Sequence, residues 1–544
     1  MKKLPRILVA VTLIFGVSLV ACEKSSTGTG AKTPVEGGTL VVGATIIDAQ
    51  LASKNPFFPN NTSVDLINFM YEPLMFFNLI AGTLEPMIAT GYEWSDNNMT
   101  VTFTIRDGIK WHDGSPLGAE DVVFTYNVLK DFPITDRFSL WKRLNSVTAD
   151  GNEVVFKFSE AFPSFPFYTN EIRIVPKHIW EAVPSIVDFL DTTPVGSGPF
   201  VWSSYTVGTD VQLKANKDYW IGSPKVDNFI IRLYNNASNL TLGLLREDIH
   251  AALGGTIAMP SVPEFLSRPN AKIQRAPGLG NWVVAMNLEN EMLSDVNVRR
   301  AMRMAINTGD LISRGEYDMV YPTSYGFLPA VFSDLMSEKA KEPHVYDPAM
   351  AVKLLEDSGY TKGSDGIFQK GGKRLSFTYH NASGAPAQQM EAGMIQQWLL
   401  NIGIEVIPRL ATWPELTSLL QNGGFDLLQN AIGPPPDPFA TLNTTFHSSM
   451  TAPIGQNATG MNYFRYRNSK VDVLLDEVAN VVDPSVQKQL FGQIQDILID
   501  DVPYLPMYNT GPRVPYYDGT RYSGWVGDAP ALSNRAVINI YEVR

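Results

Sequence analysis

Histidine and cysteine are the side chains best able to bind metals or act as nucleophiles, and this chain is poor in both. Its only cysteine is Cys22, which excludes a disulfide framework and a zinc ribbon. Successive histidines lie at least 36 residues apart, a spacing that excludes the H-E-x-x-H motif of zinc peptidases. The histidines stand at positions 112, 178, 250, 344, 380 and 447. We therefore expect no metal site and no cofactor.

Motifs for nucleotide and ester chemistry are also missing. The chain has no G-x-x-x-x-G-K-[ST] loop, so it is not expected to be an ATPase. The Gly-Ser-Gly at 196–198 lacks the G-x-S-x-G pattern of a hydrolase nucleophile. The acidic pairs at 120–121, 247–248 and 500–501 are adjacent residues, which point in different directions and cannot form facing glycosidase carboxylates. An exported glycosidase or peptidase, built from residues distant in sequence, stays open as the enzymatic alternative.

Length and charge narrow the class of protein. A chain of 544 residues is expected to form two or three lobes. Its formal charge of −12 becomes −15 once Lys2, Lys3 and Arg6 of the first 21 residues are left out. An acidic chain without a basic stripe is a poor partner for nucleic acid, so that class is set aside. Aromatic residues make up 11% of the chain, which suits either a large core or a cleft lined with flat side chains.

The N-terminus has the form of an export signal. Positively charged residues precede an apolar run from 7 to 21 that is too short to span a membrane comfortably, so 1–21 is expected to be a signal peptide. A single transmembrane anchor is the alternative. Cys22 ends the run in Leu-Val-Ala-Cys, which resembles the bacterial lipobox, in which this cysteine is acylated. Residues 22–36 would then be a lipidated cysteine and a flexible tether, holding an extracytoplasmic body at a membrane surface.

Periodicity in the body predicts alternating strands and helices. Residues 100–105 and 154–158 alternate between polar and apolar, as half-buried strands do, and 119–130 place their apolar residues on one helical face. A helix is expected to begin at Asp347-Pro348 and to end before Gly359. Further helices are expected at 299–307, 390–401 and 487–499. Strands between helices favour α/β lobes.

Several motifs together resemble one family, the extracytoplasmic solute-binding proteins of the oligopeptide and nickel type, which serve ABC importers. The resemblance covers nearly all of the chain from Gly37 onward. It is carried by Y-E-P-L at 71–74, F-T-I-R-D-G-I-K-W-H-D-G-S-P at 103–116, A-E-D-V at 119–122, P-V-G-S-G-P-F at 194–200, Y-D-P at 346–348 and D-V-P-Y-L-P-M at 501–507. Gly118 departs from the pattern, because the family usually has an N-capping threonine there.

The resemblance implies a fold and a mechanism. The fold would be α/β, with the two lobes of a periplasmic binding protein joined by a two-strand hinge and a third lobe inserted into the first. The expected boundaries are 37–60, 177–286 and 506–544 for the first lobe, 61–176 for the inserted lobe and 287–505 for the second lobe. A monomeric receptor would close on its solute by hinge motion and dock on the permease subunits of the importer, without catalysis.

The class of ligand is the most open inference from the resemblance. Relatives carry oligopeptides, nickel complexes, haem or β-linked oligosaccharides, and histidine spacing disfavours bare nickel. Counting from Phe425-Asp426, the carboxylate that anchors a peptide amine in the family would fall at Pro434 or Pro435, with Asp437 close behind. Oligopeptide is the first expectation, and oligosaccharide is the alternative. Ligand contacts are expected from Trp413, Asp437, Gln429, Asn430, Trp282, Tyr508 and Asn509, with core burial as the alternative for the tryptophans.

Overall fold

The structure is a computed structural model, and it describes most of the chain after the N-terminal segment. The described residues are 33–45, 53–57, 64–253, 257–325, 327–383, 385–433, 437–481, 483–525, 532–533 and 535–543. The expected signal peptide at 1–21, Cys22 and most of the tether lie outside these ranges, as do Pro434 and Pro435. Within the described residues, no helix is both long enough and apolar enough to cross a bilayer.

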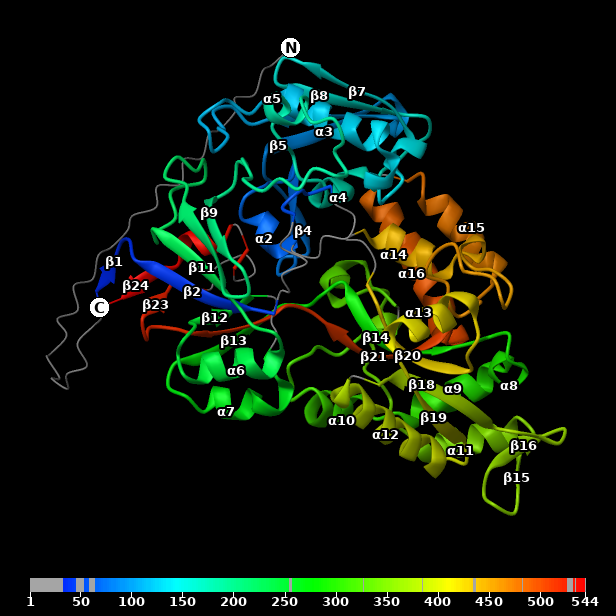
Figure 1. Cartoon of the computed structure of the whole chain (residues 1–544). Helices are drawn as coiled ribbons and strands as arrows, with labels where there is room; N and C mark the ends of the chain where they lie inside the picture. The colour runs from blue at the N-terminus through cyan, green and yellow to red at the C-terminus, as the bar shows by residue number, and fades with distance from the viewer. Residues whose placement is uncertain are drawn as a thin grey trace, which may run out of the picture.

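The first lobe is built on a seven-stranded sheet whose β2 lies parallel to its neighbours β11 and β12 (Figure 1). A three-stranded sheet joins the start of the described body to the C-terminal strand. In order across the large sheet, the strands are β13 (Ala271–Arg275), β22 (Arg513–Tyr517), β12 (Ala251–Ala252), β2 (Thr39–Ala44), β11 (Asn228–Leu233), β10 (Asp210–Ala215) and β9 (Phe200–Thr206). The other elements are β1 (Pro34–Val35), β23 (Tyr522–Ser523), β24 (Tyr541–Val543), α6 (Ala237–Leu245) and α7 (Val262–Leu266).

The inserted lobe carries a four-stranded antiparallel sheet covered by α3 (Ala119–Asp131). The predicted strand at 100–105 is confirmed as β6, and the predicted helix at 119–130 is confirmed as α3. Gly118 offers no capping side chain. The Asp121 carboxylate instead accepts a hydrogen bond from the Gly118 backbone N–H at 2.9 Å. The elements are α2 (Val64–Asn68), β3 (Met75–Asn78), β4 (Thr83–Pro86), β5 (Ala89–Ser95), β6 (Thr100–Ile105), β7 (Leu144–Asp150), β8 (Glu153–Phe158), α4 (Phe165–Tyr168) and α5 (Lys177–Trp180).

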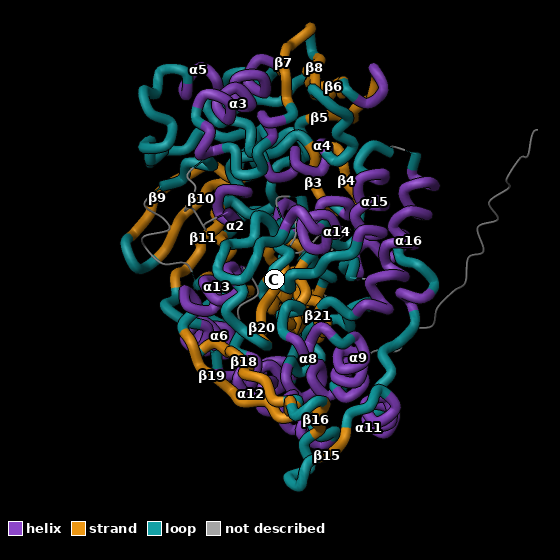
Figure 2. Tube along the Cα trace, turned by 90° about the vertical axis from the view of Figure 1, so that its right-hand side faces the viewer, coloured by secondary structure: helices purple, strands orange, loops and turns teal. Residues whose placement is uncertain are grey.

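The second lobe surrounds a five-stranded mixed sheet. In order across this sheet, the strands are β19 (Glu405–Ala411), β18 (Ser376–Ala382), β20 (Leu427–Ile432), β14 (Gly280–Met286) and β21 (Tyr504–Thr510). Its helices are α8 (Glu291–Ser294), α9 (Val296–Ala305), α10 (Thr308–Asp310), α11 (Pro348–Asp357), α12 (Pro386–Asn401), α13 (Trp413–Asn422), α14 (Pro438–Phe446), α15 (Ser469–Val478) and α16 (Pro484–Asp501). A small hairpin sheet contains β15 (Thr361–Lys362), β16 (Phe368–Lys370) and β17 (Lys373–Arg374). From the side, α14, α15 and α16 stand between the five-stranded sheet and the inserted lobe (Figure 2).

The hydrophobic cores show which lobes are packed as one unit. Strand residues of the first lobe, such as Val42, and of the inserted lobe, such as Phe103, belong to one continuous buried cluster. The second lobe has its own clusters, represented by Leu399 and Phe446. Phe77 of β3 is the inserted lobe's buried contribution to one of them. The first and inserted lobes therefore form one body beside the second.

The sheets place the crossing between lobes several residues away from the sequence-based boundaries. The boundaries expected from the sequence put β14 in the first lobe, up to residue 286, but its strand neighbours are those of the second-lobe sheet. The same holds for β21, since the first lobe was expected to resume at 506. The chain leaves one sheet for the other at 276–279 and at 511–512.

Candidate ligand-binding site

Two adjacent chain segments connect the lobes and form the hinge. At these crossings a Cβ on Gly278 would lie 1.8 Å from the carbonyl oxygen of Thr510, and a Cβ on Gly511 would lie 1.8 Å from that of Ala276. Only glycine allows backbones to approach so closely. Asn509 is fully buried here, and its amide nitrogen donates to the Gly278 and Gly280 carbonyl oxygens at 2.9 and 2.8 Å. The structure therefore places Asn509, an expected ligand contact, within the hinge.

A pair of tryptophans lies on the second lobe, just beyond the first crossing. Trp282 is on β14, Trp413 is the first residue of α13, and their ring centroids are 6.5 Å apart. The Trp413 side chain is 47% exposed, which argues against a purely core role. α13 starts at this residue because Thr412 and Glu415 form a capping box, in which the Glu415 carboxylate accepts from the Thr412 N–H at 2.7 Å.

The remaining expected contacts on β20 and β21 differ in exposure. Gln429 is 2% exposed and donates to the Glu391 carboxylate at 2.8 Å, so its amide is already paired. Tyr508 is buried and its hydroxyl donates to the same carboxylate at 2.8 Å. Asn430 is partly exposed, and its side chain donates to the Ala431 carbonyl oxygen. Of these three, Asn430 is the one that solvent reaches.

Asp437 is buried at the N-terminus of α14. Its carboxylate oxygens accept hydrogen bonds from the N–H groups of Phe439 and Ala440 at 3.1 and 3.0 Å, and it also pairs with the Ser164 hydroxyl of the inserted lobe. Burial raises the pKa of Asp437 to about 6, although these hydrogen bonds act in the opposite direction. The carboxylate therefore caps a helix and bridges two lobes, with 3% of the residue exposed.

A buried acidic cluster, which was not predicted from the sequence, lies beside the hinge. Glu391 of α12 and Glu316, which follows a helical turn at Leu311–Gly315, both lie within reach of the Tyr508 hydroxyl. Arg513 of the first lobe pairs with Glu316 at 2.7 Å. The sequence did contain a signal, because Glu391 precedes Ile395 and Leu399 at helical spacing and so shares their buried face.

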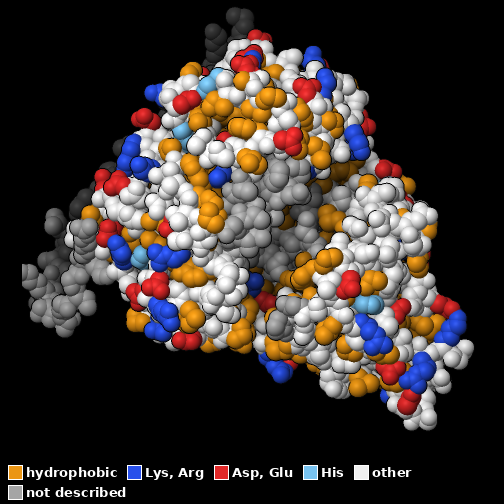
Figure 3. All heavy atoms as spheres, viewed as in Figure 1, with side chains coloured by type: hydrophobic (Ala, Val, Ile, Leu, Met, Phe, Trp, Pro, Cys, Tyr) orange, Lys and Arg blue, Asp and Glu red, His pale blue; other side chains and the backbone are white. Residues whose placement is uncertain are grey.

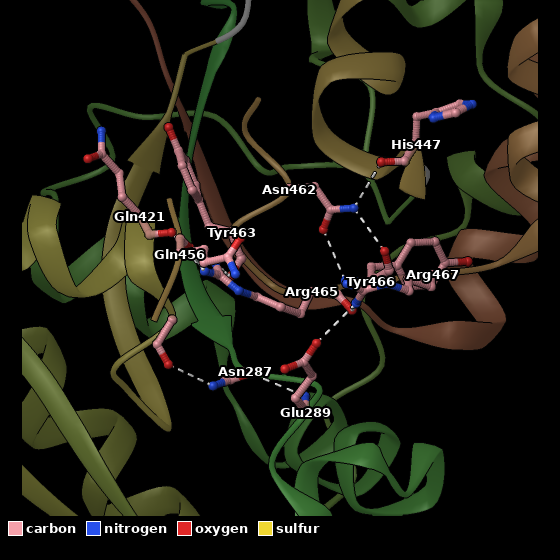
Figure 4. A network of polar contacts seen from close by, with 11 residues as sticks. Asn287, Glu289, Gln421, His447, Gln456, Asn462, Tyr463, Arg465, Tyr466 and Arg467 are labelled. Atoms are coloured by element: carbon pink, nitrogen blue, oxygen red, sulfur yellow. Dashed lines mark hydrogen bonds and ion pairs between the residues drawn. The ribbon is translucent and has the colours of Figure 1, made fainter. Parts of the chain in front are cut away.

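A network around Arg465 fixes the far end of α13 (Figure 4). The buried Arg465 guanidinium donates to the carbonyl oxygens of Leu420 and Gln421, in the last turn of α13, at 3.2 and 2.7 Å. It also donates to the carbonyl oxygens of Tyr463 and Gln456 at 2.8 and 3.1 Å. Since Trp413 begins α13, this network holds the helix that presents the indole.

The face seen in Figure 3 is hollowed between the inserted lobe, the first lobe and the second lobe. The tryptophan pair follows the crossing between lobes, where the two-strand connection brings the sheets together. Such an arrangement can enclose a solute by hinge motion. Among the described residues, no cluster of three or more histidine, cysteine or acidic side chains could hold a metal ion.

Two α/β lobes on a two-strand hinge are the architecture typical of solute-binding proteins. The family model for bacterial extracellular solute-binding proteins, family 5 (middle region), matches residues 83–452, and the chain belongs to this family. The oligopeptide-binding protein AppA of Bacillus subtilis is 28% identical over 537 residues, which is 93% of this chain and 93% of AppA. The resemblance noted from the sequence and the α/β binding-protein fold are thereby confirmed.

Solved structures show the same fold. The AppA complex with a nonapeptide has a TM-score of 0.71 and 25% identity, covering 94% of this chain and 100% of that one. The periplasmic oligopeptide-binding protein of a Thermotoga maritima ABC transporter has a TM-score of 0.81 and 24% identity, covering 93% and 99%. The same protein with bound mannohexaose gives a TM-score of 0.72 at 24% identity, covering 93% and 98%.

Proposed function

We propose that the chain is the lipid-anchored extracytoplasmic receptor of an ABC importer, and that it captures oligopeptides between its first and second lobes. The observation that carries this proposal is the Trp282–Trp413 pair, which combines a partly exposed aromatic surface with a position next to the hinge. Aromatic side chains give large contact areas to peptide and side-chain groups. The similarity to an oligopeptide-binding protein over nearly the whole chain supports the same ligand class.

The closed receptor would deliver its ligand to the permease subunits of the importer as a monomer. It is not an enzyme in this proposal, because its function requires only capture and release. Cys22 would carry the acyl chains that hold it at the membrane. Replacing Cys22 with serine should move the protein from the membrane fraction to the soluble fraction, and intact-mass measurement should show the loss of acylation. Unchanged membrane association would contradict the lipid anchor.

An oligosaccharide receptor is the second candidate, and one observation favours it. The only acidic side chain expected near the peptide amine, Asp437, already accepts hydrogen bonds from the α14 backbone and is 3% exposed. A tilted tryptophan pair would also suit the faces of a sugar chain. The mannohexaose complex of the Thermotoga maritima protein shows that this fold can hold such a ligand.

A thermal-shift screen of the intact chain can separate the two ligand classes. Nonapeptides with free and with acetylated N-termini would be compared with mannohexaose and cellohexaose. A ligand at 100 times its dissociation constant should add about 2.7 kcal/mol to the free energy of unfolding. We expect stabilisation by the peptides, including the acetylated one, because Asp437 is occupied by its capping bonds. Stabilisation by a neutral sugar alongside no response to any peptide would replace the first candidate with the second.

A further inference from the structure

The acidic cluster beside the hinge contains more negative than positive charge. Glu391 is 0% exposed and Glu316 is 4% exposed, and the two carboxyl groups interact directly with each other. The Tyr508 hydroxyl lies 2.8 Å from Glu391 Oε1 and 3.3 Å from Glu316 Oε1, and it has one proton to donate. Arg513 lies 2.7 Å from Glu316 Oε2, whereas its cross-strand neighbour Arg275 donates to the Asp318 carbonyl oxygen. Two ionised carboxylates would leave one buried negative charge without a partner.

A single bound proton balances this cluster. Glu316 holds the guanidinium, whereas both oxygens of Glu391 face neutral donors, Gln429 and Tyr508. A proton on Glu391 completes the network, because the carboxylic acid can then donate to Glu316 while still accepting from Gln429. When two carboxyl groups share one buried site, one of them stays protonated, because two negative charges there would repel each other and lack solvent.

The electrostatic environment agrees with this assignment. Burial and the neighbouring Glu316 carboxylate raise the pKa of Glu391 well above its ordinary value, while the hydrogen bonds from Tyr508 and Gln429 act in the opposite direction. Tyr379, on β18, also faces Glu391. Burial, followed by neighbouring carboxylates, raises the pKa of both Tyr379 and Tyr508, so both phenols stay neutral.

The cluster also joins the moving parts of the molecule. Arg513 belongs to β22 in the first-lobe sheet, whereas Glu391 lies on α12 of the second lobe. Glu316 follows the helical turn at Leu311–Gly315, at the point where Tyr317 and Met319 pack against the first lobe. Tyr508 is the direct cross-strand partner of Trp282, so the cluster lies beside the strand position that carries the candidate ligand surface. A rotation of one lobe against the other would change the distance between the guanidinium and Glu316.

We propose that Glu391, Glu316 and Arg513 are positioning residues that form a proton-linked lock on the hinge. With the proton on Glu391, the Arg513–Glu316 pair is charge-balanced and fixes the angle between the lobes. Loss of the proton places a second negative charge beside Glu316, and the cluster rearranges with the lobes. The consequence for ligand capture rests on the proposed receptor function, but the lock itself acts in the ligand-free protein.

The distance between two spin labels, one on each lobe, tests the lock without any ligand. Val207 in the first lobe and Val473 in the second are 73% and 64% exposed, and each would be replaced by cysteine in the intact chain carrying Cys22→Ser. Pulsed electron paramagnetic resonance would record the distance distribution at about pH 6 and about pH 10, which bracket the raised titration of Glu391. We expect the distribution to shift between the two pH values. Identical distributions would overturn the proposal, whether or not the chain binds peptide.

Matched variants assign the shift to the cluster. Glu391→Gln imitates the protonated acid, so its distribution should match the low-pH form at both pH values. Glu316→Gln removes the carboxylate that interacts with Glu391 and pairs with Arg513, so it should also abolish the pH dependence. This second variant keeps the test available if the first misfolds. Glu72→Gln is the control, because Glu72 is 0% exposed with a pKa raised by burial to about 7, but lies in the core shared by the first and inserted lobes. A shift that survives in both cluster variants, or disappears in the control, would overturn the assignment.

Discussion

Trp282 and Trp413 lie with their ring centroids 6.5 Å apart and their planes inclined by 48°, although they come from distant segments of the chain. Trp282 is partly buried on a strand of the second-lobe sheet, whereas Trp413 is 47% exposed at the start of α13. The strand fixes one ring, and the capping box and the Arg465 network fix the helix that carries the other. The second lobe therefore presents a preorganised aromatic surface next to the hinge.

Trp413→Ala should weaken ligand binding without unfolding the protein. A nonapeptide should lose about 1–3 kcal/mol of binding free energy, as is typical when a stacking aromatic is removed. The unfolding temperature of the free protein should change little, because half of the side chain is already exposed. Calorimetry measures binding and thermal unfolding measures stability, with Trp180→Ala as the comparison. Trp180 is 1% exposed, so its replacement should cost about 3–5 kcal/mol of stability. A large loss of stability in Trp413→Ala would indicate that Trp413 is a core residue and not a ligand contact.

Asp437→Asn should change how stability depends on pH. Burial raises the pKa of Asp437 from 3.8 to about 6, so between these values the folded protein binds more protons than the unfolded chain. Stability contributed by this group is therefore present at low pH and is lost as pH rises through 6, with a magnitude on the order of 2–3 kcal/mol. Asparagine stays neutral, so the variant should gain stability relative to the parent between pH 4 and 7.

Urea denaturation at several pH values measures this difference, and the same variant reports on ligand binding. Because Asp437 serves as a helix cap, Asp437→Asn should leave nonapeptide affinity nearly unchanged. If the difference in unfolding free energy between Asp437→Asn and the parent does not change with pH, the raised pKa of Asp437 is contradicted. Selective loss of peptides with free N-termini would instead make Asp437 an amine anchor.

Gly278→Ala should disturb the hinge. Its Cβ would lie 1.8 Å from a backbone oxygen on the other connection, so the two segments must separate, at a cost of about 1–3 kcal/mol of stability. Gly393→Ala is the matched control, because nothing lies within 4 Å of its Cβ in the middle of α12. Denaturant unfolding should show the control gaining up to about 1 kcal/mol. Equal effects at both positions would contradict the close approach at the hinge.

Arg465→Ala should destabilise the second lobe by at least about 3 kcal/mol, because hydrogen bonds from a charged group to four backbone oxygens are lost. Nonapeptide affinity should also fall, since α13 loses the contacts that hold its last turn. Arg467→Ala removes a neighbouring pair with Glu289 that is largely exposed, and should cost no more than about 1 kcal/mol. If the two variants unfold alike in urea, the network does not hold the helix.

Local sequence signals predicted many elements correctly. Asp347 caps α11 by accepting from the Met350 N–H at 2.8 Å, with Pro348 in the first turn and Gly359 just past the end at a φ of 83°. These residues act within a few positions of one another, so their effect is visible in sequence. The helix expected at 299–307 instead spans Val296–Ala305, because Asp295 caps it earlier than the apolar pattern suggested.

The site depended on contacts between distant segments, which the sequence could not supply. Gln429, Tyr508 and Asn509 have the side chains of a ligand site, but they lie on strands whose neighbours bury them. Glu391 was not predicted from the sequence because Tyr508 and Glu316, which contact its carboxylate, come from other elements. Exposure of Trp413 likewise follows from where α13 packs, and periodicity alone cannot show it.

Titration calorimetry of a nonapeptide into the purified intact chain tests the central claim most directly. The account predicts saturable binding of one peptide per chain, with a negative heat-capacity change because apolar surface is buried between the lobes. The affinity should fall in Trp413→Ala and persist in Asp437→Asn. The contradicting result is saturable binding of mannohexaose while none of several nonapeptides gives a measurable heat or competes with mannohexaose.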